Sequence, residues 1–199
     1  YTFSLKQNVV FHDGTVFNAQ AVASNLDRIT DSDTLSQRAA FMLGPYRGYN
    51  IIDDYTIQLL LSTPYAPLLD SLSQVYLGVA SPAALAEYSN NRYQFHQVGT
   101  GPYKFVEYLP GDRIIIERNP AYTWGPDFYT KGPDDPGVIQ EIEFRFFTDE
   151  STRLVALQNN DVQIMGEILP TDASALSASS DFQLITTPIP GQPAQFMFN

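Results

Sequence analysis

The chain has 199 residues, of which 44% are hydrophobic and 13% aromatic, so it can bury one sizeable core or two modest ones. Its 22 acidic residues outnumber 11 Lys and Arg, which gives a net charge of minus 11. Nucleic acid is therefore excluded as a partner, because binding it depends on cations that neutralise phosphates. Cysteine is absent, which excludes disulfides, thiolate metal sites and cysteine nucleophiles.

The first thirty residues predict a strand, a turn and a helix. Tyr1 to Leu5 alternates apolar and polar side chains, as a half-buried strand does. His12 to Thr15 has the composition of a tight turn. Asn18 then precedes apolar residues at three- and four-residue spacing up to Ile29, which is typical of a capped amphipathic helix.

Shorter elements follow as far as a polar stretch, Ser89 to Gln97, which we interpret as an irregular segment and a candidate domain boundary. Proline, glycine and paired aspartates separate the apolar runs before it. The patterns predict helices over 34–42, 64–72 and 82–88, and a hairpin over 50–59 that turns at Asp53 and Asp54.

The second half of the chain again mixes strand and helix patterns, which indicates a mixed α/β (α+β) fold. A long loop, Asn119 to Gly137, is expected to be held by Tyr122 and Trp124, although the same two rings would also suit a sugar-stacking platform. Asp149 is a predicted N-cap. We expect strands over 103–106, 113–117, 139–147, 162–165, 182–186 and 195–198, and helices over 150–158 and 170–178.

Three segments resemble, in order and spacing, the extracellular solute-binding proteins of family 5, which serve ABC transporters for peptides, nickel complexes and similar ligands. They are YTFSLKQNVVFHDGTVFNAQAVASNLDRI from Tyr1, VGTGPYKFVEYLPGDRIIIERNPAYTWG from Val98, and FFTDESTRLVALQNNDVQIM from Phe146. The chain departs from the family pattern at Ala21, where an acidic residue is usual, and at Asn159-Asn160, where a glycine is usual. Asparagine also tolerates the left-handed conformation that such a turn needs.

The resemblance implies a type II periplasmic-binding-protein clamp, of which 1–97 would form the extra small domain and 98–199 part of ligand-facing lobe I. Both ends of the chain have strand-like sequences, so we expect an internal fragment of a longer protein. The resemblance further implies an exported protein, in the periplasm or at the cell surface, with or without a lipid anchor. Its partners would be a small solute such as an oligopeptide and a permease, and the fragment itself would be a monomer.

Candidate ligand-binding residues lie in three places. Tyr76 stands in an apolar stretch that suits a cavity wall. Two loops are expected to follow buried strands, where α/β folds tend to bind ligands. The residues of these loops are Met165, Gly166 and Glu167, and then Gly191 and Gln192.

Several acidic residues and one histidine are candidates for metal binding or catalysis. His12 beside Asp13 lacks the further donors of a metal site, and the aspartate pairs 53–54 and 134–135 lack calcium-loop spacing, so we predict solvated turns and no metal or cofactor. Glu141 and Glu143 share one strand face at about 7 Å, which would suit a carbohydrate-active hydrolase, although a solvated charged strand face is the favoured explanation. Passive solute capture without catalysis is the favoured function, and hydrolysis is the alternative.

Overall fold

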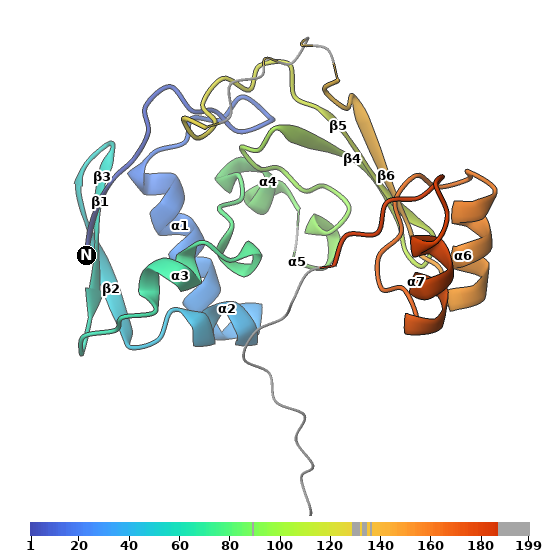
Figure 1. Cartoon of the computed structure of the whole chain (residues 1–199). Helices are drawn as coiled ribbons and strands as arrows, with labels where there is room; N and C mark the ends of the chain where they lie inside the picture. Colours follow the sequence, from blue (N-terminus) through green and yellow to red (C-terminus); the bar gives the residue numbers. More distant parts are fainter. Residues whose placement is uncertain (89, 129–131, 133–134, 136, 187–199) are drawn as a thin grey trace, which may run out of the picture. The chain divides into compact units, whose positions relative to one another are not determined.

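The computed structural model describes residues 1–88, 90–128, 132, 135 and 137–186 (Figure 1). The chain forms two compact units, Tyr1–Arg145 and Phe146–Asn199. The expected mixed fold is confirmed, since helices accompany two antiparallel three-stranded sheets. The units divide at a different place from the expected boundary after residue 97. The assignment of 1–97 to an extra domain and of 98–199 to a lobe remains a prediction.

The first sheet combines the start of the chain with the predicted hairpin. β1 (Thr2–Ser4) and β2 (Tyr46–Asp53) pair with opposite edges of β3 (Thr56–Leu61), both antiparallel. The Asp53 carboxylate accepts the Tyr55 amide hydrogen at 2.8 Å, so this aspartate pair serves the hairpin turn as predicted.

Helix α1 (Ala19–Thr30) lies beside this sheet in Figure 1 and provides much of the core. It begins as predicted, because the Asn18 side chain accepts the Ala21 amide hydrogen at 2.9 Å. The expected three- and four-residue spacing places one face against the sheet. The buried core comprises Ala19, Ala23, Leu26, Ile29, Ala39, Leu43, Ile57, Leu59 and Leu77.

Short helices lie between α1 and β2, and again between β3 and the second sheet. The predicted helix over 34–42 is split, because Leu35 adopts a left-handed conformation (φ 52°) and α2 starts only afterwards. The stretch predicted to be irregular contains a helix, α5, and the helix predicted from residue 64 is shorter than expected. The elements are η1 (Ser32–Thr34), α2 (Gln37–Met42), α3 (Leu68–Leu72), η2 (Val75–Leu77), α4 (Pro82–Glu87) and α5 (Asn90–Tyr93).

The second sheet belongs to the same unit and has the order β4-β5-β6, with antiparallel pairs throughout. β4 (Tyr103–Leu109) and β5 (Arg113–Arg118) form the predicted hairpin, whose turn requires the positive φ of Gly111, 78°. β6 (Glu141–Arg145) is shorter than predicted. It ends at Arg145 because its partner there, Arg113, is the first residue of β5.

The long loop after β5 is held as predicted. The Trp124 indole donates a hydrogen bond to the Thr100 carbonyl at 2.8 Å, and the Tyr122 and Trp124 rings meet edge-on, with centroids 5.4 Å apart. Rings that contact each other and the backbone in this way hold a loop, and the sugar-platform reading gains no support. Asp134, of the second aspartate pair, lies outside the described residues.

The second unit contains α6 (Glu150–Gln158) and α7 (Pro170–Ser177), both predicted. Hydrogen bonds from the Ser151 hydroxyl and the Thr152 amide lower the pKa of the N-cap Asp149 to about 2. Asn160 takes the left-handed conformation expected of it (φ 62°). The predicted strands over 162–165 and 182–186 are wrong, and the one over 195–198 lies outside the described residues.

None of the helices within the described ranges is both long and apolar enough to cross a bilayer.

Candidate functional site

Two of the motifs quoted above meet in the first unit. The His12 amide donates to the Gly99 carbonyl at 2.9 Å, and His12 Nε2 lies 2.9 Å from the Gly101 carbonyl oxygen. The pKa of His12 is lowered, because the effect of burial is larger than the opposing effect of the Gly101 hydrogen bond. Because a carbonyl only accepts, the neutral imidazole carries its proton on Nε2.

The turn that presents His12 is fastened to α4. Gly14 has a φ of 85°, which few other residues adopt, and the Asp13 carboxylate accepts hydrogen bonds from the Thr15 amide at 2.9 Å and the Ser81 hydroxyl at 2.5 Å. Burial of Asp13 would raise its pKa, but these hydrogen bonds bring the pKa below its ordinary value. Asp13 is therefore a structural anion of the turn, as predicted.

The segment from Val98 to Pro102 is fixed along its whole length, because each of its five carbonyls accepts a hydrogen bond. The donors come from separate elements, which makes this segment a rigid wall. The Val98 carbonyl accepts from the Ser81 amide and the Tyr93 hydroxyl, and the Gly99 carbonyl accepts from the His12 amide. The Thr100 carbonyl accepts from the Trp124 indole, and the Gly101 carbonyl from the side chains of His12 and Asn119. The Pro102 carbonyl accepts from the Asn119 amide and the Arg118 guanidinium.

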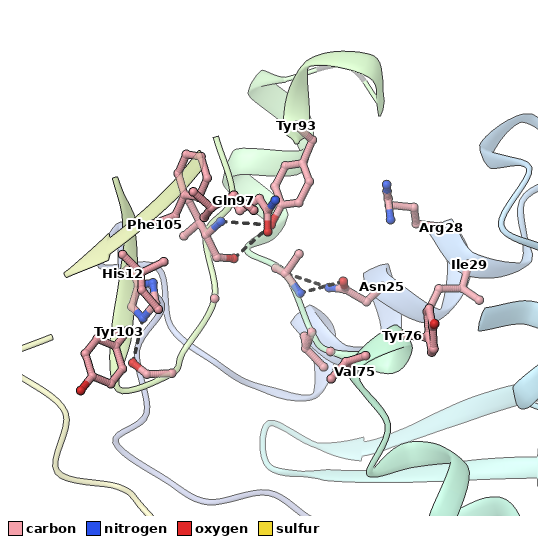
Figure 2. Close-up of a pocket in the computed structure, with 18 of the residues that line it drawn as sticks. His12, Asn25, Arg28, Ile29, Val75, Tyr76, Tyr93, Gln97, Tyr103 and Phe105 are labelled. Atoms are coloured by element: carbon pink, nitrogen blue, oxygen red, sulfur yellow. Dashed lines mark hydrogen bonds between the residues drawn. The ribbon is translucent and has the colours of Figure 1, made fainter. Parts of the chain in front are cut away.

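This wall borders a cavity of about 480 Å³, which we call the Arg28 cavity (Figure 2). Its volume lies within the range of small-molecule sites, about 300–1,000 Å³. It is lined by His12, Asn25, Arg28, Ile29, Ser36, Val75, Tyr76, Gly78, Val79, Ala80, Tyr93, Gln97, Val98, Gly99, Gly101, Tyr103, Phe105, Ile114 and Ile116.

Asn25 attaches the segment before α4 to α1 beside this cavity. Its amide nitrogen donates to the carbonyls of Ala80 at 2.8 Å and Ala21 at 2.9 Å, and its oxygen accepts from the Ala80 amide at 2.9 Å. The pairing with both Ala80 groups is visible as dashed lines in Figure 2. Asn25 is 5% exposed, so its polar atoms are paired inside the protein.

The charged side chain among the described residues that line the Arg28 cavity is Arg28 itself. Arg28 lies over the Tyr93 ring at 6.0 Å, and the Tyr93 hydroxyl is itself held by the Val98 backbone amide and carbonyl at 3.1 and 3.2 Å. The described residues that line the cavity include no Asp or Glu. Arg28 thus gives this lining a positive charge, in a chain whose net charge is minus 11.

Apolar side chains complete the walls. Tyr103 and Phe105 come from β4, and Ile114 and Ile116 from β5. Val75 and Tyr76 come from η2, where they are 87% and 51% exposed. Apolar side chains combined with a few fixed polar groups are the usual composition of a small-molecule site.

Comparison with known protein families identifies the family of the chain. The model of the bacterial extracellular solute-binding proteins, family 5 Middle, matches residues 1–199. The chain belongs to this family. The resemblance seen in the sequence is therefore confirmed.

Individual relatives agree with the family. The glutathione-binding protein GsiB of Pectobacterium atrosepticum is 31% identical over 197 residues, covering 94% of this chain and 34% of its own length. The periplasmic binding protein AgaA of A. tumefaciens R10, solved with agropinic acid, is 30% identical with a TM-score of 0.73, over 90% of this chain and 34% of that one. DppA of Helicobacter pylori, solved with the peptide STSA, is 25% identical with a TM-score of 0.72, over 90% and 37%.

These relatives are named as binding proteins, and the chain spans about a third of their length. The expected type II binding-protein fold is confirmed by the structural neighbours.

The residues singled out from the sequence lie in different places. Tyr76 lines the Arg28 cavity. Met165, Gly166 and Glu167 lie in the second unit, where Glu167 (φ 55°) pairs with Arg153 at 3.7 Å. The strand expected before them is absent. Ligand contact at this loop stays a prediction from the sequence and is the alternative to the Arg28 cavity. Gly191 and Gln192 lie outside the described residues.

Sequence reasoning missed Asn25 and Arg28. Both lie on α1, three positions apart, and such spacing places two side chains on the same helix side. That pair of polar side chains beside an apolar helical face is the signal that was available.

The hydrolase reading fits the geometry poorly. Glu143 forms an exposed ion pair with Arg145 at 2.8 Å, and this hydrogen bond lowers the pKa of Glu143. The general acid of a glycosidase needs the opposite shift, so Glu143 does not suit that role. Among the residues that the structure describes, no cluster of three His, Cys, Asp or Glu is placed to hold a metal ion.

Proposed function

We propose that the protein containing this chain captures a small, carboxylate-bearing, peptide-like solute and delivers it to an ABC transporter permease. The chain supplies one wall of the solute site, the Arg28 cavity. Residues 1–97 act as the extra small domain and 98–199 as part of lobe I. The protein works as an exported monomer, in the periplasm or at the cell surface.

The observation that carries this proposal is the Arg28 cavity in a chain of family 5. Among the described residues that line the cavity, Arg28 contributes the formal charge, and the Val98–Pro102 wall contributes rigid polar groups. Glutathione, agropinic acid and the peptide STSA, the ligands named for the relatives, all carry a carboxylate. A guanidinium binds carboxylates with strong, charge-assisted hydrogen bonds.

Passive solute capture accounts for the polar side chains around the cavity without assigning any of them a catalytic role. The polar atoms around the cavity are held in structural hydrogen bonds, as His12, Asn25 and Tyr93 illustrate. Such a site is largely preformed, and preorganisation lowers the cost of binding.

Calorimetric titration of the full-length protein tests this function. We expect micromolar or tighter binding of at least one member of a panel containing glutathione, dipeptides, tetrapeptides and agropinic acid, and none of glucose or maltose. Hydrolysis of a glycoside, or no heat with any peptide or acid while a sugar binds, would contradict solute capture of this kind.

A further inference from the structure

A second cavity, of about 230 Å³, lies in the core of the first unit, and we call it the Leu26 cavity. It is bounded by α1, by β1 and β3 of the first sheet and by the segment around η2. Three residues, Asn25, Ile29 and Val79, line both this cavity and the Arg28 cavity. The two cavities are therefore adjacent and share a wall.

The Leu26 cavity is partly enclosed, and most of the side chains that line it are apolar. Leu26, Ile57 and Leu59 are at most 5% exposed and belong to the buried core. Half-buried side chains at Phe3, Leu5 and Val22 border it as well. Apolar surface of this kind gains from contact with an apolar molecule and gains little from water.

Charge is missing from this cavity. None of the described residues that line it is ionisable, and its polar side chains are Ser4 and Asn25. Ser4 is exposed, and the Asn25 amide is already engaged in three hydrogen bonds. A charged ligand would lose its hydration without gaining a partner, so the cavity selects a neutral molecule.

The volume of the Leu26 cavity limits the size of the ligand. Native cores are packed with few voids larger than a water molecule, and an apolar cavity of about 150 Å³ suffices to hold benzene. From the volume and the walls together, we propose that the Leu26 cavity is a second binding site, for a small neutral apolar molecule about the size of one aromatic ring or a short branched hydrocarbon. This site does not depend on the solute proposed above.

Benzene is the probe for this site, with benzoate as its charged counterpart. In full-length protein with labelled methyl groups, benzene should shift the methyl resonances of Ile57, Leu59 and Leu26 in a saturable way. Benzoate at the same concentration should leave them unchanged. Absence of saturable shifts with benzene, or equal shifts with benzoate, would overturn the proposal, whatever the outcome of the solute titrations.

A pair of variants locates the probe. Val22→Phe places a ring at the half-buried edge of the cavity and should weaken benzene binding at least tenfold. Gln20→Phe adds the same ring to an exposed position of the same helix and should leave binding unchanged. Unchanged binding in Val22→Phe would contradict the site. If Val22→Phe fails to fold, contacts between benzene protons and the Ile57 methyl groups in the unmodified protein decide, and their absence counts against the proposal.

Discussion

Replacing Arg28 with methionine should weaken binding of a carboxylate-bearing solute roughly 10- to 100-fold. Arg28 is the positively charged side chain that both lines the cavity and lies over the Tyr93 ring, 6.0 Å from its centroid. A hydrogen bond to a charged group contributes about 1.5–3 kcal/mol, and every 1.4 kcal/mol is about tenfold in affinity. Methionine keeps an unbranched apolar side chain of moderate length but removes the guanidinium.

Titrations with a peptide and with its C-terminal amide separate charge recognition from general damage. The amide should bind Arg28→Met and the unmodified protein with similar affinity. Arg47→Met, which removes an exposed arginine from β2, should bind both ligands normally. Equal losses for peptide and amide would show that Arg28 supports the structure of the site and does not read the carboxylate.

Replacing Asn25 with leucine should destabilise the first unit by about 2–4 kcal/mol. The substitution keeps the number and branching of the side-chain heavy atoms but removes three hydrogen bonds, of 2.8 to 2.9 Å. It leaves the Ala80 amide and carbonyl without the Asn25 side chain, which bonds both groups. A backbone group buried without a partner costs about 1–3 kcal/mol.

Hydrogen exchange of the peptide that contains Gly78 to Ser81 measures this effect locally. Faster exchange by roughly 30- to 1,000-fold corresponds to the expected loss, since 1.4 kcal/mol is about tenfold. Asn50→Leu, on the exposed face of β2, removes one surface hydrogen bond to Gln58 and should change little. Unaltered exchange in Asn25→Leu would mean that Asn25 does not hold this segment.

Local signals explain what could be predicted from the sequence. α1 was predicted because its cap, Asn18, and its apolar spacing both lie within one stretch of chain. The β4–β5 hairpin was predicted because Pro110 and Gly111 mark a turn between two alternating segments. The order of the motifs then identified the family, which the family model confirms.

Contacts between distant parts of the chain explain what was missed. The alternating residues from Val162 to Met165 predict a strand, but a strand forms only beside a neighbour, and no strand lies in the described part of the second unit. Asn25 meets Ala80 across 55 positions, and His12 meets Gly101 across 89. Nothing in the local pattern around either residue reports such a partner.

The placement of the solute in the Arg28 cavity is tested most directly by a comparison of two glycines. A Cβ at Gly99 or at Gly166 meets no atom within 4 Å, so a side chain can leave the backbone at either position without a clash at its first atom. Gly99 borders the cavity, and Gly166 belongs to the loop of the second unit that was singled out from the sequence. In full-length protein, Gly99→Leu should weaken solute binding at least tenfold, and Gly166→Leu should leave it unchanged. The reverse result would contradict the placement of the solute in the Arg28 cavity.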